Sequence, residues 1–240
     1  MRNRDKTKTL TIQDFKPTFW STFFAFLGIV ILICLGTWQL HRLDWKTNLI
    51  RERESGFFAP SITINFQKNN IEEYFWRRVK ITGVFDHSKE LFLAARSMRG
   101  NVGFHILTPF KLSNGRTILT NRGWVPREKK EQSQRLQGQI QGEVVLEGIL
   151  TPGSGKGPFT PGNDKAKNVW LYVDFEEMSD VVGAVLEPAV IDIIKNAPGG
   201  FPIGSQTRIN LPNDHMQYAI TWYALAVTLA FVWFFWNKNR

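Results

Sequence analysis

Two long stretches without a charged side chain constrain this chain more than any other feature. Phe19–Leu40 runs for 22 residues and Tyr218–Trp236 for 19. At 1.5 Å per residue, each is long enough as an α-helix to cross a hydrocarbon core of ~30 Å. Two crossings place both termini on one side of the membrane and the intervening segment on the other. The sequence therefore predicts a membrane protein whose N- and C-terminal transmembrane helices flank one external domain.

The segment boundaries follow from these two stretches. We expect residues 1–18 and 237–240 to be tails, residues 19–40 and 218–236 to be the transmembrane helices, and residues 41–217 to be the external domain. A segment of that length suffices for one domain with a hydrophobic core and is short for two.

The formal net charge of +9 raises the question of a nucleic-acid partner, but the distribution of charge argues against one. Residues 41–217 hold 23 of the 30 basic and 19 of the 21 acidic residues, without a long basic run. The remaining basic residues lie in the tails: Arg2, Arg4, Lys6, Lys8, Lys16, Lys238 and Arg240. Basic tails beside a span favour contact with the anionic lipid bilayer and a cytoplasmic location of the tails. We predict a bacterial inner-membrane protein with cytoplasmic termini, a periplasmic domain and no nucleic-acid partner.

The external domain has mainly the pattern of β-strands. Apolar and polar residues alternate from Arg78 to Phe85, as in a half-buried strand. Further strand-length runs are Leu91–Ala95, Val102–Phe110, Thr117–Asn121, Val144–Leu150, Val169–Val173 and Pro188–Lys195. Asn114–Gly115 is typical of a hairpin turn. We therefore expect a mainly antiparallel β (α+β) domain.

Other local signals fill the spaces between the strands. Arg42–Glu54 continues the first apolar helix, which Gly56 and Pro60 should end. Asp174 followed by Glu177 resembles a capping box and predicts a short helix that Gly183 closes. The Gln-rich segment 129–141 is expected to be a mobile excursion and the Gly/Pro-rich segment 152–162 a loop.

No catalytic motif is present in the sequence. It contains no G-x-S-x-G, H-E-x-x-H or C-x-x-C, and Gly153–Pro158 has the wrong spacing for a phosphate-binding loop. The single cysteine, Cys34, lies in the first apolar stretch, which excludes an intramolecular disulfide. We therefore do not expect an enzyme.

The four histidines are the remaining candidates for chemistry. His87 lies in a predicted turn, where we expect it to be exposed, and His105 lies in a strand, where a hydrogen-bonded structural role is favoured. His41 is at the outer end of the first span and fits a boundary residue. His215 opens the second span.

His215 stands out because of the residues that share its helix face. Ala219, Trp222 and Ala226 follow it at helical spacing, and Tyr218 lies one turn along. An imidazole beside aromatic and small residues suits a porphyrin, whose iron accepts a neutral imidazole. Interfacial capping of the helix is the competing interpretation.

Five segments in order resemble one known family. At the spans they are Leu35-Gly-Thr-Trp-Gln-Leu-His-Arg-Leu-Asp-Trp-Lys-Thr-Asn-Leu-Ile50 and Asn213-Asp-His-Met-Gln-Tyr-Ala-Ile-Thr-Trp-Tyr223. Between these lie Arg77-Arg-Val-Lys-Ile-Thr-Gly-Val-Phe85, Thr108-Pro-Phe110 and Asn121-Arg-Gly-Trp-Val-Pro126. Together they resemble the Surfeit-locus family of cytochrome c oxidase assembly proteins, over essentially the whole chain. Met216 departs from the leucine expected in that pattern.

The resemblance implies an assembly factor. It implies binding of haem a at the outer membrane interface, with His215 as the iron ligand, and delivery of the haem to the oxidase core subunit. The implied cofactor-binding residues are His215, Tyr218, Trp222, Trp38 and Gln39, and the implied partners are the core subunit and the haem a synthesis enzyme. The alternative function is that of a membrane scaffold that holds an oxidase subunit and does not itself bind haem.

The carboxylates of haem a would require cationic partners. Arg42, Arg122 and Arg208 are candidates, because arginine pairs with carboxylates through two hydrogen bonds. For each of them, a surface charge or a structural salt bridge is the competing interpretation.

Overall fold

The computed structural model describes residues 17–64, 66, 70–207 and 211–238. The chain divides into two compact units. One unit contains most of the first long helix and all of the second, and the other, Glu52–Ile209, contains the end of the first helix and the β-strands.

Two long helices lie near the ends of the chain, as the apolar stretches predict. Helix α1 spans Phe19–Phe58 and helix α3 spans His215–Lys238. Both are long and apolar enough to cross a membrane. The predicted extension of α1 is confirmed, and the helix ends two residues before Pro60, with Gly56 inside its last turns.

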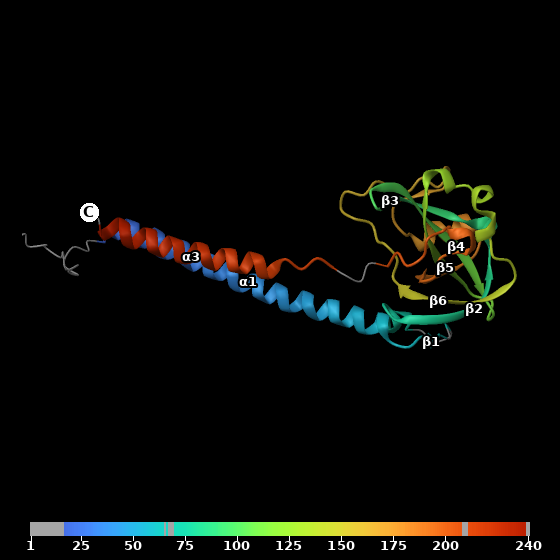
Figure 1. The fold of residues 1–240 in the computed structure, drawn as a ribbon, viewed down its shortest axis with the longest axis horizontal. Coiled ribbons are helices and arrows are strands. Elements are labelled where there is room, and N and C mark those ends of the chain that lie inside the picture. Colours follow the sequence, from blue (N-terminus) through green and yellow to red (C-terminus); the bar gives the residue numbers. More distant parts are fainter. Residues whose placement is uncertain (1–16, 65, 67–69, 208–210, 239–240) are drawn as a thin grey trace, which may run out of the picture. The chain divides into compact units, whose positions relative to one another are not determined.

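Helices α1 and α3 pack closely side by side (Figure 1). The buried residues of the pair are small or polar: Ala25, Gly36, Ala219, Ala226 and Asn237. A Cβ atom added to Gly36 would lie 2.9 Å from the ring of Tyr223. Ala219 and Ala226 on α3 therefore form part of the packing surface between the two helices.

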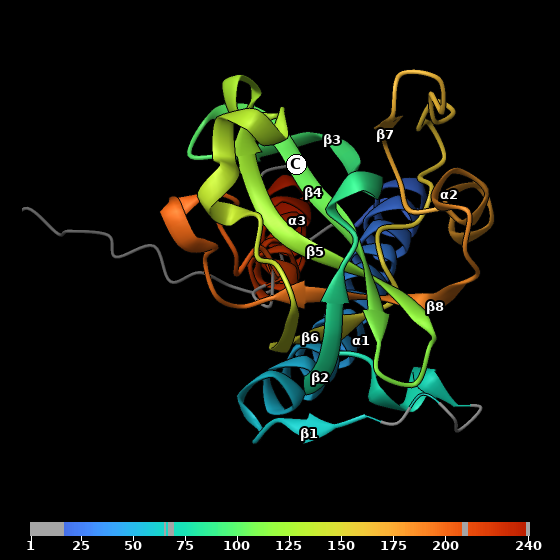
Figure 2. The same ribbon diagram turned by 90° about the vertical axis from the view of Figure 1, so that its right-hand side faces the viewer.

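The described residues of the second unit form eight strands. They are β1 (Ile62–Thr63), β2 (Arg78–Phe85), β3 (Leu91–Met98), β4 (Asn101–Leu112), β5 (Thr117–Pro126), β6 (Glu143–Thr151), β7 (Val169–Trp170) and β8 (Leu186–Ile193). The order in the sheet is β1-β2-β6-β8-β5-β4-β3-β7, and β2 also pairs with β4. Strands β2, β6, β8, β5 and β4 therefore close into a ring, which can be followed in Figure 2. Among the strand pairs of the described residues, β1–β2, β3–β7 and β5–β8 are parallel and the others are antiparallel, so the domain is mainly antiparallel, as expected.

Alternation along the strands supplies two hydrophobic cores on opposite faces of the sheet. The core inside the ring draws residues from all five ring strands, and Ile118 and Ile191 belong to it. Their neighbours Leu119 and Val190 point to the other face, where helix α2 (Phe175–Val182) covers them. The ring is thus filled by side chains, and the outer face of the sheet is partly covered by a helix.

Two local signals, the cap of the short helix and the hairpin turn, are confirmed. The Asp174 carboxylate accepts a hydrogen bond from the backbone N–H of Glu177 at 3.0 Å, and Gly183 ends α2 with a φ of 70°. Asn114–Gly115 forms the turn between β4 and β5, and Gly115 has a φ of +83°.

The expectation for segment 129–141 was wrong. The segment following β5 forms the short 3₁₀ helices η4 (Arg127–Lys129) and η5 (Gln132–Gly138), which pack against the ring. The Arg135 side chain is only 1% exposed and is paired with Glu90. A polar, Gln-rich composition predicts solvent contact, and here a buried ion pair overrides it.

Candidate functional site

His215 is the first residue of α3, and its imidazole is held from α1. Its Nδ1 atom lies 2.7 Å from Oε1 of Gln39. An amide oxygen only accepts hydrogen bonds, so Nδ1 carries the proton and donates it. The lone pair of the neutral ring is then on Nε2. The ring is thus oriented by one nitrogen and has the other available for a ligand.

The other predicted cofactor-binding residues surround this pair less closely. Trp222 is half-buried on α3, whereas Trp38 and Tyr218 are 53% and 56% exposed. None of the contacts in the described part of the chain joins these three side chains to the imidazole. Of the five predicted residues, the structure therefore brings together Gln39 and His215, and leaves the three aromatics as nearby apolar surface on the same two helices.

The donor set at His215 is a single oriented imidazole. Among the described residues, no group of three His, Cys, Asp or Glu side chains is placed to hold an ion. A haem supplies four nitrogen ligands itself and needs one axial imidazole from the protein. Iron-binding histidines ordinarily donate their second ring N–H to an oxygen acceptor, as His215 does to Gln39.

Two further histidines lie where the sequence indicated. His41 is exposed on α1. His105 is on β4, and Asn121 Nδ2 lies 3.4 Å from its Nδ1, which confirms a hydrogen-bonded position in the domain.

His87 is the exception, because the expectation of an exposed turn residue was wrong. The residue is 8% exposed and stacks on Phe85 with ring centroids 5.2 Å apart. Its Nε2 donates to the carbonyl oxygen of Ile140 at 2.8 Å, and its Nδ1 lies 3.3 Å from Nη1 of Arg122. Both ring nitrogens are used within the domain.

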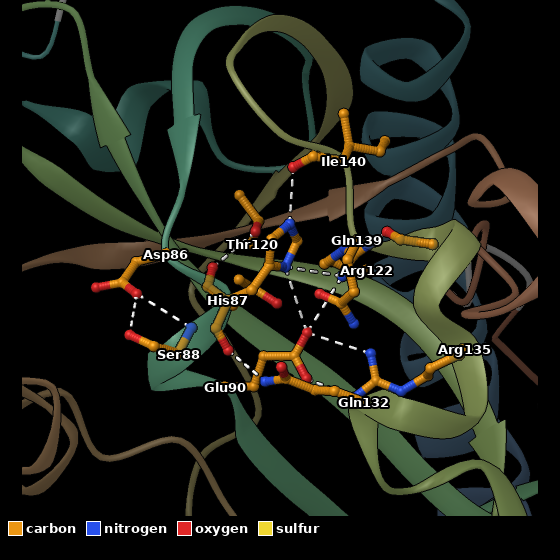
Figure 3. Close-up of polar contacts among 12 residues, drawn as sticks. Asp86, His87, Ser88, Glu90, Thr120, Arg122, Gln132, Arg135, Gln139 and Ile140 are labelled. Carbon is orange, nitrogen blue, oxygen red and sulfur yellow. Dashed lines mark hydrogen bonds and ion pairs between the residues drawn. The ribbon is translucent and has the colours of Figure 1, made fainter.

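Glu90 is the centre of a buried ion cluster beside His87 (Figure 3). Arg135 binds both Glu90 oxygens, and Nη1 of Arg122 binds Oε1 at 3.2 Å. Arg122 also donates to the Gly138 carbonyl, and Gln132 donates to the His87 carbonyl. The cluster therefore fastens η5 and the residues that follow it to the ring.

The three arginines proposed as carboxylate partners have different positions. The Arg122 side chain is 2% exposed, so the structural salt bridge is its observed role. Arg42 is exposed, and its guanidinium lies 4.3 Å from the ring centroid of Trp45. Arg208 lies outside the described residues.

In the ion cluster, burial and the neighbouring charges shift the pKa values in opposite directions. Burial raises the pKa of Glu90, but hydrogen bonds from His87 and Arg135 and the charges of Arg135 and Arg122 outweigh it, giving a pKa of about 2. Burial also lowers the pKa of Arg122 to about 10. Elsewhere in the domain, burial raises the pKa of Asp192 although Thr207 and Asn121 donate hydrogen bonds to it.

Comparison with known proteins identifies the family. The model of the SURF1 family matches residues 26–227. This chain belongs to the SURF1 family. Surfeit locus protein 1 of Mus musculus is 42% identical over 217 residues, covering 83% of this chain and 70% of the mouse protein. The human Surfeit locus protein 1 is 41% identical over 234 residues, covering 88% and 77% of the two chains.

A more divergent relative matches over a similar share of the chain, at lower identity. A SURF1-like protein of Drosophila melanogaster is 34% identical over 220 residues, covering 83% of this chain and 72% of the fly protein. These relatives are eukaryotic, so a bacterial inner-membrane location stays a prediction.

Proposed function

We propose that this chain is an assembly factor for cytochrome c oxidase that binds haem a through His215 and assists its delivery into the oxidase core subunit. Membership of the SURF1 family and the ordered motifs at both apolar helices support the role in assembly. The enzyme that makes haem a is the proposed donor.

One observation carries the haem part of the proposal, namely the hydrogen bond from His215 to Gln39. It fixes the tautomer and orientation of a ring whose Nε2 remains available. The exposed rings of Trp38 and Tyr218 offer flat apolar surface on the same helix pair. Bound haem would supply the iron that Nε2 ligates, and the protein would supply orientation and apolar contact.

A delivery factor must also release its cargo, and the helix pair suits this requirement. The His215 ring is oriented through one nitrogen and offers the other as a single axial ligand. Haem that is held by one axial ligand is bound less firmly than haem that is held by two. The proposed setting is the bacterial inner membrane, with cytoplasmic termini and the β domain in the periplasm. The two apolar helices support insertion in a bilayer.

The test is an optical spectrum of the purified full chain after co-expression with the haem a synthesis enzymes. We expect a reduced haem a band in the wild type and its loss in His215→Ala. Gln39→Leu should weaken haem retention by about 10–100-fold, because the orienting acceptor is lost. His41→Ala, a change of an exposed histidine two residues from Gln39, is the matched control and should retain haem.

The same experiment decides the alternative. Absence of haem from a well-expressed wild type would overturn the carrier proposal and favour a scaffold that holds an oxidase subunit without haem. Oxidase content in cells separates the two again, since His215→Ala should reduce it if the protein carries haem and leave it nearly intact if the protein is a scaffold.

A further inference from the structure

The β domain has a cavity of about 420 Å³ beside the ion cluster. Its apolar lining comes from Phe85 on β2, Ile140, Val144 and Leu146 around β6, and Ile193 at the end of β8. Its cationic lining comes from Lys80, Arg122 and Lys195. The volume lies within the range of about 300–1,000 Å³ that small-molecule sites occupy.

Positive charge at this cavity is not balanced by the acidic residue that also lines it. That residue, Glu147, lies opposite Lys80 in the register of β2 with β6, and its Oε1 atom lies 3.8 Å from Nε of Arg78. No ion pair among the described residues includes Lys80 or Lys195. One carboxylate therefore stands against the three positive charges of Arg78, Lys80 and Lys195 in the part of the chain that the structure describes.

The buried cluster adds a third positive charge at the same wall. Both carboxylate oxygens of Glu90 accept hydrogen bonds from Arg135, and Arg122 donates only to Oε1, which it shares with Arg135. His87 adds no negative charge: its Nε2 donates to Ile140, and its Nδ1 lies 3.3 Å from Nη1 of Arg122 and 3.5 Å from Oε1 of Glu90. One carboxylate and two guanidiniums leave a net charge of +1.

This excess charge is on the residue that borders the cavity. Arg122 is among the residues that line the cavity, and Arg135 is not. Burial lowers the pKa of Arg122 to about 10, which still leaves it protonated at neutral pH. A buried charge without a full partner is costly, and an anion in the adjacent space would offset that cost.

We propose that this cavity binds an organic anion whose carboxylate contacts Lys80, Lys195 and Arg122 and whose apolar body packs on Phe85, Val144 and Ile193. The apolar walls exclude inorganic phosphate as the preferred ligand, because its whole surface is polar. The site lies wholly in the β domain and is independent of haem binding by His215.

The probe is 4-phenylbutyrate, and its uncharged analogue 4-phenylbutyramide has nearly the same shape. The full chain in a non-ionic detergent is titrated with each compound, and binding is followed by ligand-observed NMR. We expect 4-phenylbutyrate to bind with a Kd of about 1 mM, typical of a ligand of this size, and the amide to bind at least about tenfold more weakly. Equal affinity for the two compounds, or no binding of either, would overturn the proposal.

Two lysine substitutions locate the binding. Both Lys80 and Lys195 are exposed, so Lys80→Ala with Lys195→Ala should fold normally and lower the affinity for 4-phenylbutyrate about tenfold or more. Lys167→Ala, whose side chain is 79% exposed beside Asp164, is the matched control and should leave the affinity unchanged. Val144→Phe, which fills the apolar part of the cavity, should also reduce binding.

The alternative occupant is an acidic side chain of a partner protein. The peptide acetyl-Leu-Glu-Leu-amide represents it in the same titration. Binding of this peptide without binding of 4-phenylbutyrate would overturn the small-ligand proposal and identify the cavity as a peptide site. Loss of 4-phenylbutyrate binding in the control Lys167→Ala equal to that in the double variant would overturn it as well.

Discussion

The helix pair and the β domain place their large apolar side chains on opposite sides. In α1 and α3, large side chains such as Phe26 and Ile220 are 67% and 62% exposed, and small residues fill the contact between the helices. In the β domain, Phe110 and Trp170 are fully buried. An apolar outer surface suits a hydrocarbon solvent, and an apolar interior suits water. The two regions of one chain therefore expose surfaces that suit different surroundings.

Their polar contacts differ in the same way. The helix pair is joined by isolated hydrogen bonds without full charges, such as those between Thr37 and Tyr223 and between His215 and Gln39. The β domain buries a cluster of full charges around Glu90. A neutral hydrogen-bonded pair costs little to bury, whereas a buried charge must be paired with an opposite charge and hydrogen-bonded. Stability of the β domain should therefore depend far more on one polar residue than stability of the helix pair does.

The largest expected effect is that of Glu90→Ala. It leaves Arg122 and Arg135 buried without their carboxylate, so we expect a loss of about 3–5 kcal/mol of unfolding free energy in the β domain. Thermal unfolding of the full chain in detergent measures it. Glu147→Ala removes a half-exposed partner of Arg78 and should cost less than about 1 kcal/mol. Equal effects of the two changes would contradict the importance of the cluster.

Acid should weaken the β domain through the same residue. The pKa of Glu90 falls from 4.5 to about 2 on folding, so its carboxylate stabilises the fold above pH 4.5 and this contribution is lost as the pH falls towards 2. The loss amounts to about 3 kcal/mol. Asp192, whose pKa is raised by burial, acts in the opposite direction, because its protonation favours the folded state.

The difference between the wild type and Glu90→Gln separates these two contributions. Unfolding by urea at a series of pH values from 6 to 2.5 provides the measurement. Stability of the variant should vary less with pH below 4.5, and parallel curves for the two proteins would show that Glu90 does not carry the acid sensitivity.

A smaller effect is expected in the helix pair from Gly36→Val. The new Cβ would lie 2.9 Å from the Tyr223 ring, so the helices must separate locally, at a cost of about 1–3 kcal/mol. A disulfide between Ser21→Cys and Asn237→Cys, in a Cys34→Ala background, reports helix pairing, because the two native side chains lie within 3.3 Å. In glutathione buffers, Gly36→Val should make this disulfide about 5–150-fold easier to reduce. Ile33→Val, on an exposed face, is the control.

The smallest effect is expected from Thr37→Val in the same background. The change removes the 3.1 Å contact between the Thr37 and Tyr223 hydroxyls and keeps the shape of the side chain. Hydrogen bonds between membrane helices contribute about 0.6 kcal/mol on average, so the disulfide equilibrium should shift about threefold. A shift as large as that of Gly36→Val would mean that hydrogen bonds, rather than close packing, hold the helices together.

Local features of the fold could be predicted from the sequence. The apolar helices, the cap at Asp174, the end of α2 at Gly183 and the turn at Asn114–Gly115 depend on neighbouring residues, and all are confirmed. Closure of the ring was not predictable. It depends on pairing of β2 with β4 and of β5 with β8, and each joins strands that are distant in the sequence.

The candidate site likewise combines features that depend on neighbouring residues with contacts between residues distant in the sequence. His215 could be identified because its helix spacing and motif are local, but its contact with Gln39 joins residues 176 positions apart. Burial of His87 and Arg135 was missed because their partners are also remote. Arg135 lies 45 positions from Glu90, and a single sequence contains no local mark of such a pair.

Strand β8 is the last strand of the ring to be synthesised, yet it lies between β5 and β6. Until β8 is available, each of those two strands must therefore keep one edge unpaired. Open strand edges are where nascent chains associate wrongly. Folding of this domain thus includes an interval in which β5 and β6 each have an open edge, and a chain terminated before Leu186 would keep both edges open permanently.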